Sequence, residues 1–122
     1  MPSIGVGMPA LVRLEAYGAR IYDAFGHLPY LVGSAAVSKV GRDVDVRLVL
    51  PDEEFVLLFP EHRRPDRLDL KWALICDALA GLGQATTGLP IDFQIQRQTQ
   101  SDLYHGRTRV LLGLRITGGG TT

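Results

Sequence analysis

Several residue types are scarce in this 122-residue chain, and each scarcity excludes a class of protein. The single cysteine, Cys76, excludes an intramolecular disulfide and is typical of a reducing compartment, so we expect a cytoplasmic protein. No apolar run approaches the ~20 residues that span a bilayer, and the first residues lack the charged region of a signal peptide. We therefore expect no association with a membrane. Thirteen basic residues balance thirteen acidic ones, so net charge alone predicts no binding of nucleic acid.

Apolar residues, by contrast, are plentiful, at 46% of the chain, which is typical of a globular protein. The length suits one compact domain with a core and is too short for two. We expect a flexible leader over residues 1–8, one domain over residues 9–116 and a flexible, glycine-rich tail over residues 117–122.

Apolar residues that recur at three- and four-residue intervals predict two amphipathic helices. The first begins at Pro9 and ends near Gly26. The second begins near Leu68 and ends at Gly81 and Gly83.

The second helix also carries the cysteine. Its apolar stripe includes Trp72 and Ile75 and is broadened by Leu74, and Cys76 lies within this apolar pattern. A cysteine in such surroundings is more often a buried, inert thiol than a nucleophile.

Short apolar or alternating stretches predict the strands, and residues 55–59 are interpreted as the second strand of a hairpin that begins with the strand 43–50. The other expected strands are 29–32, 89–96 and 109–116, and the expected loops are 60–65 and 98–106. The predicted fold class is α+β, with a mixed sheet of four or five strands and helices packed mainly on one face. The expected core contains Leu14, Ile21, Phe25, Val44, Val46, Leu48, Trp72, Ile75, Leu79, Ile91, Phe93 and Ile95.

The strand over residues 43–50 has aliphatic side chains on one face and Asp43 and Asp45 on the other. Carboxylates that lie side by side repel each other, so a hard divalent cation such as Mg²⁺ is a natural partner. Upstream, Gly33 lets backbone N–H groups approach a phosphate, and Ser34 offers a hydroxyl donor. This stretch therefore combines groups suited to a metal ion with groups suited to a phosphate.

The strand over residues 89–96 repeats the alternation, with Ile91, Phe93 and Ile95 on its apolar face. If it lies beside the strand 43–50 with its apolar face also inward, Asp92 points to the same side as Asp43. The alternative is an exposed aspartate on an edge strand.

These residues resemble the signature of the DNA polymerase β-like nucleotidyltransferase superfamily. The signature is an apolar residue, a glycine, a glycine or serine, a spacer, and then Asp-apolar-Asp-apolar. Here Val32-Gly33-Ser34 is followed by eight residues and then by Asp43-Val44-Asp45-Val46. The resemblance covers residues 10–96, and Asp92 matches the family's third carboxylate in its order along the chain.

The resemblance implies metal-dependent transfer of a nucleotidyl group from an NTP to an unidentified acceptor, which is a small molecule, a protein or RNA. Asp43, Asp45 and Asp92 would be catalytic and would bind Mg²⁺ or Mn²⁺. Gly33 and Ser34 would bind the β- and γ-phosphates.

Two cations of the spacer are less specific candidates. Lys39 and Arg42 flank the gap before the carboxylates and could hold the triphosphate, with solvated loop cations as the alternative. Further along the chain, Arg97, Arg107 and Arg109 suggest a path for a polyanionic acceptor such as RNA.

Two other interpretations stay open. The slightly short spacer and the absence of a separate acceptor domain suit a degenerate member that binds nucleotide, nucleic acid or a partner protein without turnover. The protein could also be a small α+β interaction protein whose carboxylates form a solvated face.

Overall fold

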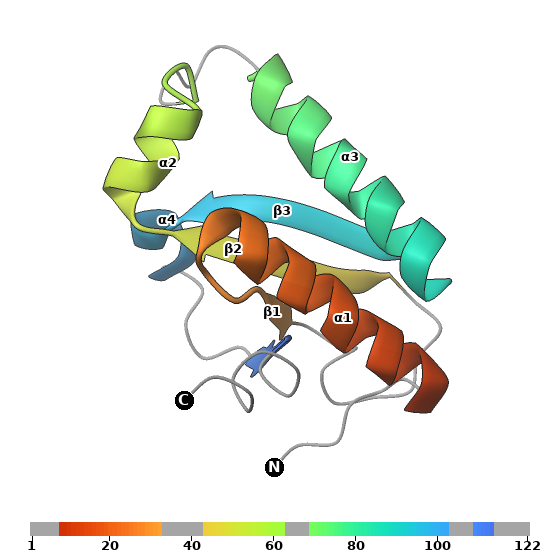
Figure 1. The fold of residues 1–122 in the computed structure, drawn as a ribbon. Helices are drawn as coiled ribbons and strands as arrows, with labels where there is room; N and C mark the ends of the chain where they lie inside the picture. Colours follow the sequence, from red (N-terminus) through yellow and green to blue (C-terminus); the bar gives the residue numbers. More distant parts are fainter. Residues whose placement is uncertain (1–7, 33–42, 63–68, 103–108, 114–122) are drawn as a thin grey trace.

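Four strands form one mixed sheet in the computed structural model, which describes residues 8–32, 43–62, 69–102 and 109–113. The strands are β1 (Tyr30–Val32), β2 (Val44–Leu50), β3 (Ile91–Arg97) and β4 (Arg109–Leu111), in the order β3-β2-β1-β4. The central pair β2 and β3 is parallel, and β1 runs antiparallel to both β2 and β4. This arrangement confirms the predicted α+β class (Figure 1).

Helices α1 (Met8–Phe25) and α3 (Leu70–Thr87) lie together on one face of the sheet, as Figure 1 shows. The helix α1 is followed by Gly26, whose φ of 80° lies in the left-handed region that glycine adopts without strain. Gly18, in the middle of this helix, allows a close approach to the residue that follows β4, because a Cβ atom there would lie 2.6 Å from the Cβ atom of Leu112. None of the described helices is long and apolar enough to cross a membrane.

Helix α3 is longer at its carboxyl end than the sequence predicts, because Gly81 and Gly83 lie inside it and its C-cap is Gly88. Gly83 has a packing role instead. A Cβ atom at Gly83 would lie 2.8 Å from the ring of Tyr17, whose hydroxyl donates a 2.7 Å hydrogen bond to the carbonyl oxygen of Leu79. The glycine therefore brings α1 and α3 together, and the prediction that it ends the helix was wrong.

The hairpin predicted after β2 is also wrong, because residues 55–59 belong mainly to the helix α2 (Asp52–Leu58). The helix begins after Pro51 with three acidic residues, which suit the positive end of the helix dipole. Phe55 and Phe59 are buried, whereas Leu57 is 82% exposed. A strand would place all three side chains on one face, but a spacing of four residues places only the two phenylalanines together.

A third correction concerns residues 98–106, which were predicted to form a loop. Residues 98–102 form the short helix α4 (Gln98–Asp102), and residues 103–108 lie outside the described residues. The first turn of α4 receives a partner from a distant part of the chain, because the backbone N–H of Thr99 donates a 3.0 Å hydrogen bond to the Asp52 carboxylate.

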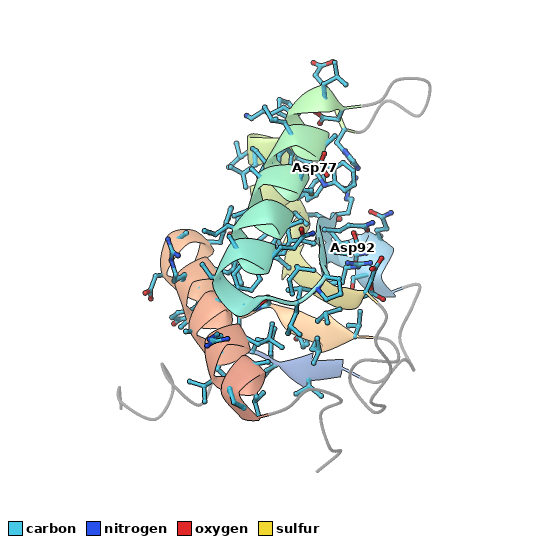
Figure 2. All side chains as sticks on the ribbon, turned by 90° about the vertical axis from the view of Figure 1, so that its right-hand side faces the viewer. Asp77 and Asp92 are labelled. Carbon is cyan, nitrogen blue, oxygen red and sulfur yellow. The ribbon has the colours of Figure 1, made fainter. Side chains whose placement is uncertain are left out.

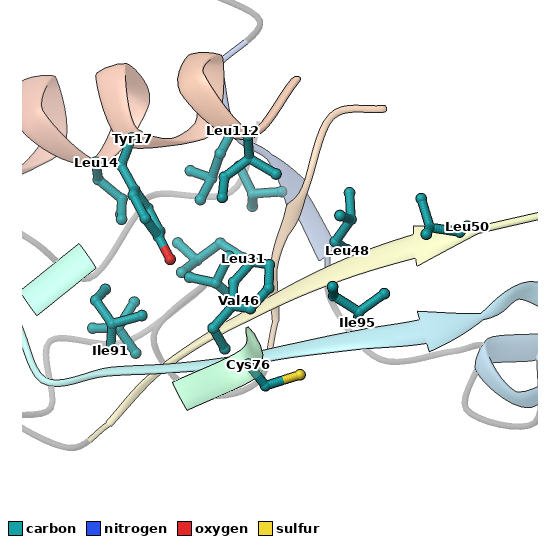
Figure 3. Packing of buried hydrophobic residues seen from close by; sticks show 14 of the residues in the cluster. Leu14, Tyr17, Leu31, Val46, Leu48, Leu50, Cys76, Ile91, Ile95 and Leu112 are labelled. Carbon is teal, nitrogen blue, oxygen red and sulfur yellow. The ribbon is translucent and has the colours of Figure 1, made fainter. Parts of the chain in front are cut away.

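The core lies between the sheet and the helices, and all twelve residues predicted for it belong to it or pack against it (Figure 3). Val44 and Val46 are buried and Asp43 is exposed, which confirms the predicted strand register. Cys76 is buried, as predicted, and the indole N–H of Trp72 donates a 2.8 Å hydrogen bond to the carbonyl oxygen of Ile95. Leu74, which the sequence adds to the apolar stripe of α3, is instead 70% exposed.

The ends of the domain fall partly outside the described residues. Met8, which was assigned to the leader, is the first residue of α1. Residues 1–7 and 114–122 lie outside the described residues. The last strand, predicted over residues 109–116, ends earlier, because β4 stops at Leu111 and residues 112 and 113 form a bend in which Gly113 has a φ of 92°.

Candidate functional site

The face of the sheet opposite α1 and α3 is polar at the start of β2 and β3. Parallel pairing places Asp45 directly beside Asp92, and Arg47 beside Gln94. Because the side chains of each strand alternate in direction and the valines point toward the helices, both carboxylates point away from them. Asp92 is seen on β3 in Figure 2, apart from Asp77 of α3. The strands β2 and β3 are therefore neighbours with their apolar faces inward, as the prediction for Asp92 requires.

A guanidinium group lies between these two carboxylates. The Nη2 atom of Arg47 is 3.0 Å from Oδ2 of Asp92 and 3.9 Å from Oδ1 of Asp45. Its Nη1 atom donates hydrogen bonds of 3.0 Å and 3.1 Å to the backbone carbonyl oxygens of Asp92 and Val46. The Arg47 side chain is only 15% exposed. The chain thus supplies its own cation at the place where the sequence predicted a metal ion.

Sequence reasoning missed the role of Arg47, although a signal was available. Arg47 follows Asp45 by two residues in an alternating strand, so both side chains must lie on the same face. Its contact with Asp92 depends on the neighbouring strand and follows only from the sheet order.

Asp43 lies immediately before β2 and is exposed. The start of this strand is held near β3 by a 2.8 Å hydrogen bond from the backbone N–H of Val44 to the carbonyl oxygen of Pro90. Within the described ranges, no group of three His, Cys, Asp or Glu residues is placed so that it could hold a metal ion. The structure therefore brings Asp45 and Asp92 together, and a three-carboxylate site that includes Asp43 stays a prediction.

Asp45 and Asp92 nevertheless have features that fit a cation. Both are in contact with one positively charged group, and their side chains are 35% and 45% exposed, which leaves them accessible to a hydrated ion. Carboxylate oxygens with room for water are the ligands that Mg²⁺ prefers. These two residues fit a divalent ion, provided that Arg47 releases them.

The predicted phosphate-binding residues Gly33, Ser34, Lys39 and Arg42 all lie outside the described residues. Arg107, proposed to guide an acceptor, lies outside them as well. Their roles stay predictions.

Arg97 has a structural partner at the opposite end of the two parallel strands. Its Nη2 atom lies 3.2 Å from Oδ2 of Asp52, at the start of α2. The same carboxylate accepts hydrogen bonds from the hydroxyl and the backbone N–H of Thr99. These hydrogen bonds, and secondarily the Arg97 charge, hold the pKa of Asp52 below its usual range. Arg97 therefore ties α2 to the end of β3, which differs from the acceptor contact suggested by the sequence.

Two buried titratable groups on the helices, the thiol of Cys76 and the hydroxyl of Tyr17, do not belong to the polar face. Burial raises the pKa of the Cys76 thiol, so little of the reactive thiolate forms at neutral pH. Burial also raises the pKa of the Tyr17 hydroxyl, with the nearby Cys76 as a smaller cause. Both residues belong to the core.

No known protein family, curated protein or solved structure matches this chain. The resemblance to the nucleotidyltransferase superfamily therefore depends on the quoted residues and on the geometry of the polar face.

Proposed function

We propose that the protein transfers a nucleotidyl group from an NTP to an acceptor in a reaction that depends on Mg²⁺ or Mn²⁺. The observation that supports the proposal most strongly is the pairing of Asp45 with Asp92 on neighbouring parallel strands. The two carboxylates come from parts of the chain separated by two helices, yet they share one face and one cation. An ordinary solvated face does not require such convergence.

Each residue has a distinct task in this proposal. Asp45 and Asp92 would hold the metal ions, with Asp43 as a further ligand. Divalent ions, when bound, stabilise the attacking and leaving oxygens of an in-line displacement. Asp92 would accept the proton of the acceptor hydroxyl. The acceptor oxygen then bonds to the α-phosphorus, and the bond from that phosphorus to the bridging oxygen breaks, so that pyrophosphate leaves with the electron pair.

The nucleotide itself would be held by residues upstream of β2. In this proposal Gly33 and Ser34 bind the β- and γ-phosphates, and Lys39 and Arg42 contribute positive charge. The acceptor is RNA, a protein or a small molecule, and the reaction takes place in the cytoplasm.

One observation favours a second candidate function, which is binding of nucleotide or a partner without turnover. Arg47 occupies the space between the carboxylates and is anchored by backbone carbonyl oxygens. If this guanidinium never leaves, the carboxylates cannot take up a metal ion, and the face can only bind.

Thermal unfolding with Mg²⁺ or Mn²⁺ and each NTP tests the metal and nucleotide sites. We expect the wild-type protein to gain stability only when metal and nucleotide are both present, because ligands that bind the folded state stabilise it. Asp45→Asn and Asp92→Asn should lose this gain. Asp23→Asn, which removes an exposed carboxylate from α1, is the matched control and should keep it.

Release of pyrophosphate then separates the enzyme from the degenerate binder. The wild-type protein is incubated with labelled NTPs and a cell extract, and both pyrophosphate and labelled acceptors are measured. Stabilisation without pyrophosphate release supports the binder. If no NTP stabilises the wild-type protein with either metal, both nucleotide functions are wrong.

A further inference from the structure

A pocket of about 340 Å³ lies at the carboxyl end of β2, on the face of the sheet opposite α1 and α3. Tyr30 of β1 is paired with Arg47 of β2 and with Leu111 of β4, and side chains paired in this way point to the same face. Val49 follows Arg47 by two residues in β2 and therefore points there too. Tyr30, Val49 and Leu111 all line the pocket, so its floor continues the polar face beyond Arg47.

The pocket combines apolar side chains with a small number of polar groups, which is typical of sites for small molecules. Val49, Pro51 and Leu111 supply apolar walls. His27 lines the pocket as well, and its Nε2 atom lies 3.0 Å and 3.3 Å from the two carboxylate oxygens of Glu54. Because a carboxylate only accepts hydrogen bonds, Nε2 is the nitrogen that carries the proton. The neutral ring then keeps Nδ1 as an acceptor for a ligand.

A flat ring with an exocyclic amino group suits these features. The amino group can donate a hydrogen bond to Nδ1 of His27, and the faces of the ring can pack against the apolar walls. Among the common nucleobases that carry an amino group, adenine alone has no carbonyl oxygen. Such an oxygen would lose its hydrogen bonds to water against the apolar walls.

The position of the pocket suits a nucleotide that is bound along β2. Val49 follows Asp45 by four residues, which corresponds to ~13 Å along the strand. An extended nucleotide can therefore place its triphosphate near Asp45 and its base beside Val49 on the same face of the sheet.

We propose that this pocket binds the adenine base of the nucleotide and that His27 recognises its amino group. The choice of a nucleotide as the ligand rests on the proposed function. The pocket and the contact between His27 and Glu54 are independent of that function. The protein then prefers ATP to the other NTPs.

Adenosine and inosine test the pocket without metal and without phosphate. Inosine has a carbonyl oxygen in place of the amino group, so it cannot donate to Nδ1 and should bind about tenfold more weakly than adenosine. His27→Phe keeps a flat ring but lacks the acceptor. This variant should bind adenosine about tenfold more weakly than the wild-type protein and inosine no more weakly, so that the preference disappears. A residue with only a structural role would weaken the binding of both nucleosides alike.

NMR titration of the backbone amide signals measures both affinities in each protein. Gln96→Ala is the matched control, because Gln96 lies beside Val49 in the parallel pair but is not among the described residues that line the pocket. Neither affinity should change in this control. Val49→Phe is a second variant if His27→Phe does not fold, since its larger side chain fills part of the pocket and should weaken the binding of both nucleosides.

The outcomes separate this inference from the proposed function. If adenosine does not bind, if inosine binds equally well, or if His27→Phe keeps the preference for adenosine, the assignment of the pocket is wrong even where the wild-type protein releases pyrophosphate from NTPs. If His27→Phe removes the preference but no pyrophosphate is ever released, the adenine pocket stands and the transferase proposal fails.

Discussion

Two carboxylate–arginine clusters lie at the two ends of the parallel pair β2 and β3, and they are built differently. At the start of the strands, Asp45 and Asp92 both contact the guanidinium of Arg47. Beyond their carboxyl ends, a single carboxylate, Asp52, is matched by Arg97 and by two hydrogen bonds from Thr99. We name these the shared cluster and the matched cluster.

The difference between the clusters indicates different roles. The matched cluster has balanced charge and joins α2, β3 and α4, so it acts as a structural tie. The shared cluster places two carboxylates side by side on neighbouring strands, and like charges opposite each other repel. Solvent-accessible ion pairs add little stability in return.

The largest expected effect comes from a substitution in the core beneath the strands that carry both clusters. Phe93 of β3 is buried, and Phe93→Ala should reduce the free energy of unfolding by ~3–5 kcal/mol because it leaves a cavity. Urea unfolding measures this change. Gln94→Ala, on the next residue and the opposite face, is the control and should stay within ~0.5 kcal/mol of the wild type. Similar losses in the two variants would contradict the assignment of the faces.

The arginines should differ next. Arg47→Met leaves Asp45 and Asp92 facing each other and should cost ~1–2 kcal/mol, since hydrogen bonds to charged groups are lost and repulsion remains. Arg97→Met leaves one carboxylate that keeps its Thr99 partners and should cost less than ~1 kcal/mol. Urea unfolding at low and high salt should show salt rescue of the first variant only.

A double substitution sharpens this difference. Asp92→Asn should lower stability in the wild-type background, where it removes the 3.0 Å partner of Arg47. In the Arg47→Met background the same change should raise stability, because only repulsion from Asp45 is then removed. If Asp92→Asn has the same sign in both backgrounds, the three side chains do not act as one cluster.

The matched cluster should also contribute to the loss of folding stability at low pH. The pKa of Asp52 is lowered in the folded state, so its contribution to stability is present above the usual carboxyl range and is lost as the pH falls through the lowered pKa. Asp52→Asn should therefore be less stable than the wild type at neutral pH, and this difference should disappear in acid. Unfolding curves across this pH range test the prediction, and a constant difference would contradict it.

The smallest expected effect is a difference between two variants in the pKa of Asp52. The hydrogen bond from the hydroxyl of Thr99 is the largest single cause that lowers the pKa of this carboxyl group, ahead of the hydrogen bond and of the charge of Arg97 taken separately. Thr99→Ala should therefore raise the Asp52 pKa further than Arg97→Met does, as followed by NMR titration of the side-chain carboxyl carbon. The reverse order would make the arginine the main partner.

Much of the fold could be predicted from the sequence because local periodicity reports which face of an element is buried. The alternation in residues 43–50 and 89–96 predicted β2, β3 and their apolar faces, and the helix from Pro9 to Gly26 was found nearly as expected. The same alternation predicts that Asp45 and Asp92 lie on the polar faces of their strands, as they do in the structure. The two-residue periodicity can be predicted from the sequence because successive side chains of a strand point to opposite faces, and the local backbone alone determines this alternation.

Tertiary structure decided the features that depend on distant partners. Phe55 and Phe59 suit a short strand or a helix equally well, and packing selected the helix. Gly83 was predicted to end the helix, but it lies inside α3, where Tyr17 of α1 packs against it. The pairing of Asp45 with Asp92, and the position of Arg47 between them, follow from the order of strands in the sheet. Local periodicity determines which way a side chain points, whereas the strand that lies beside it is chosen by contacts between residues far apart in the chain.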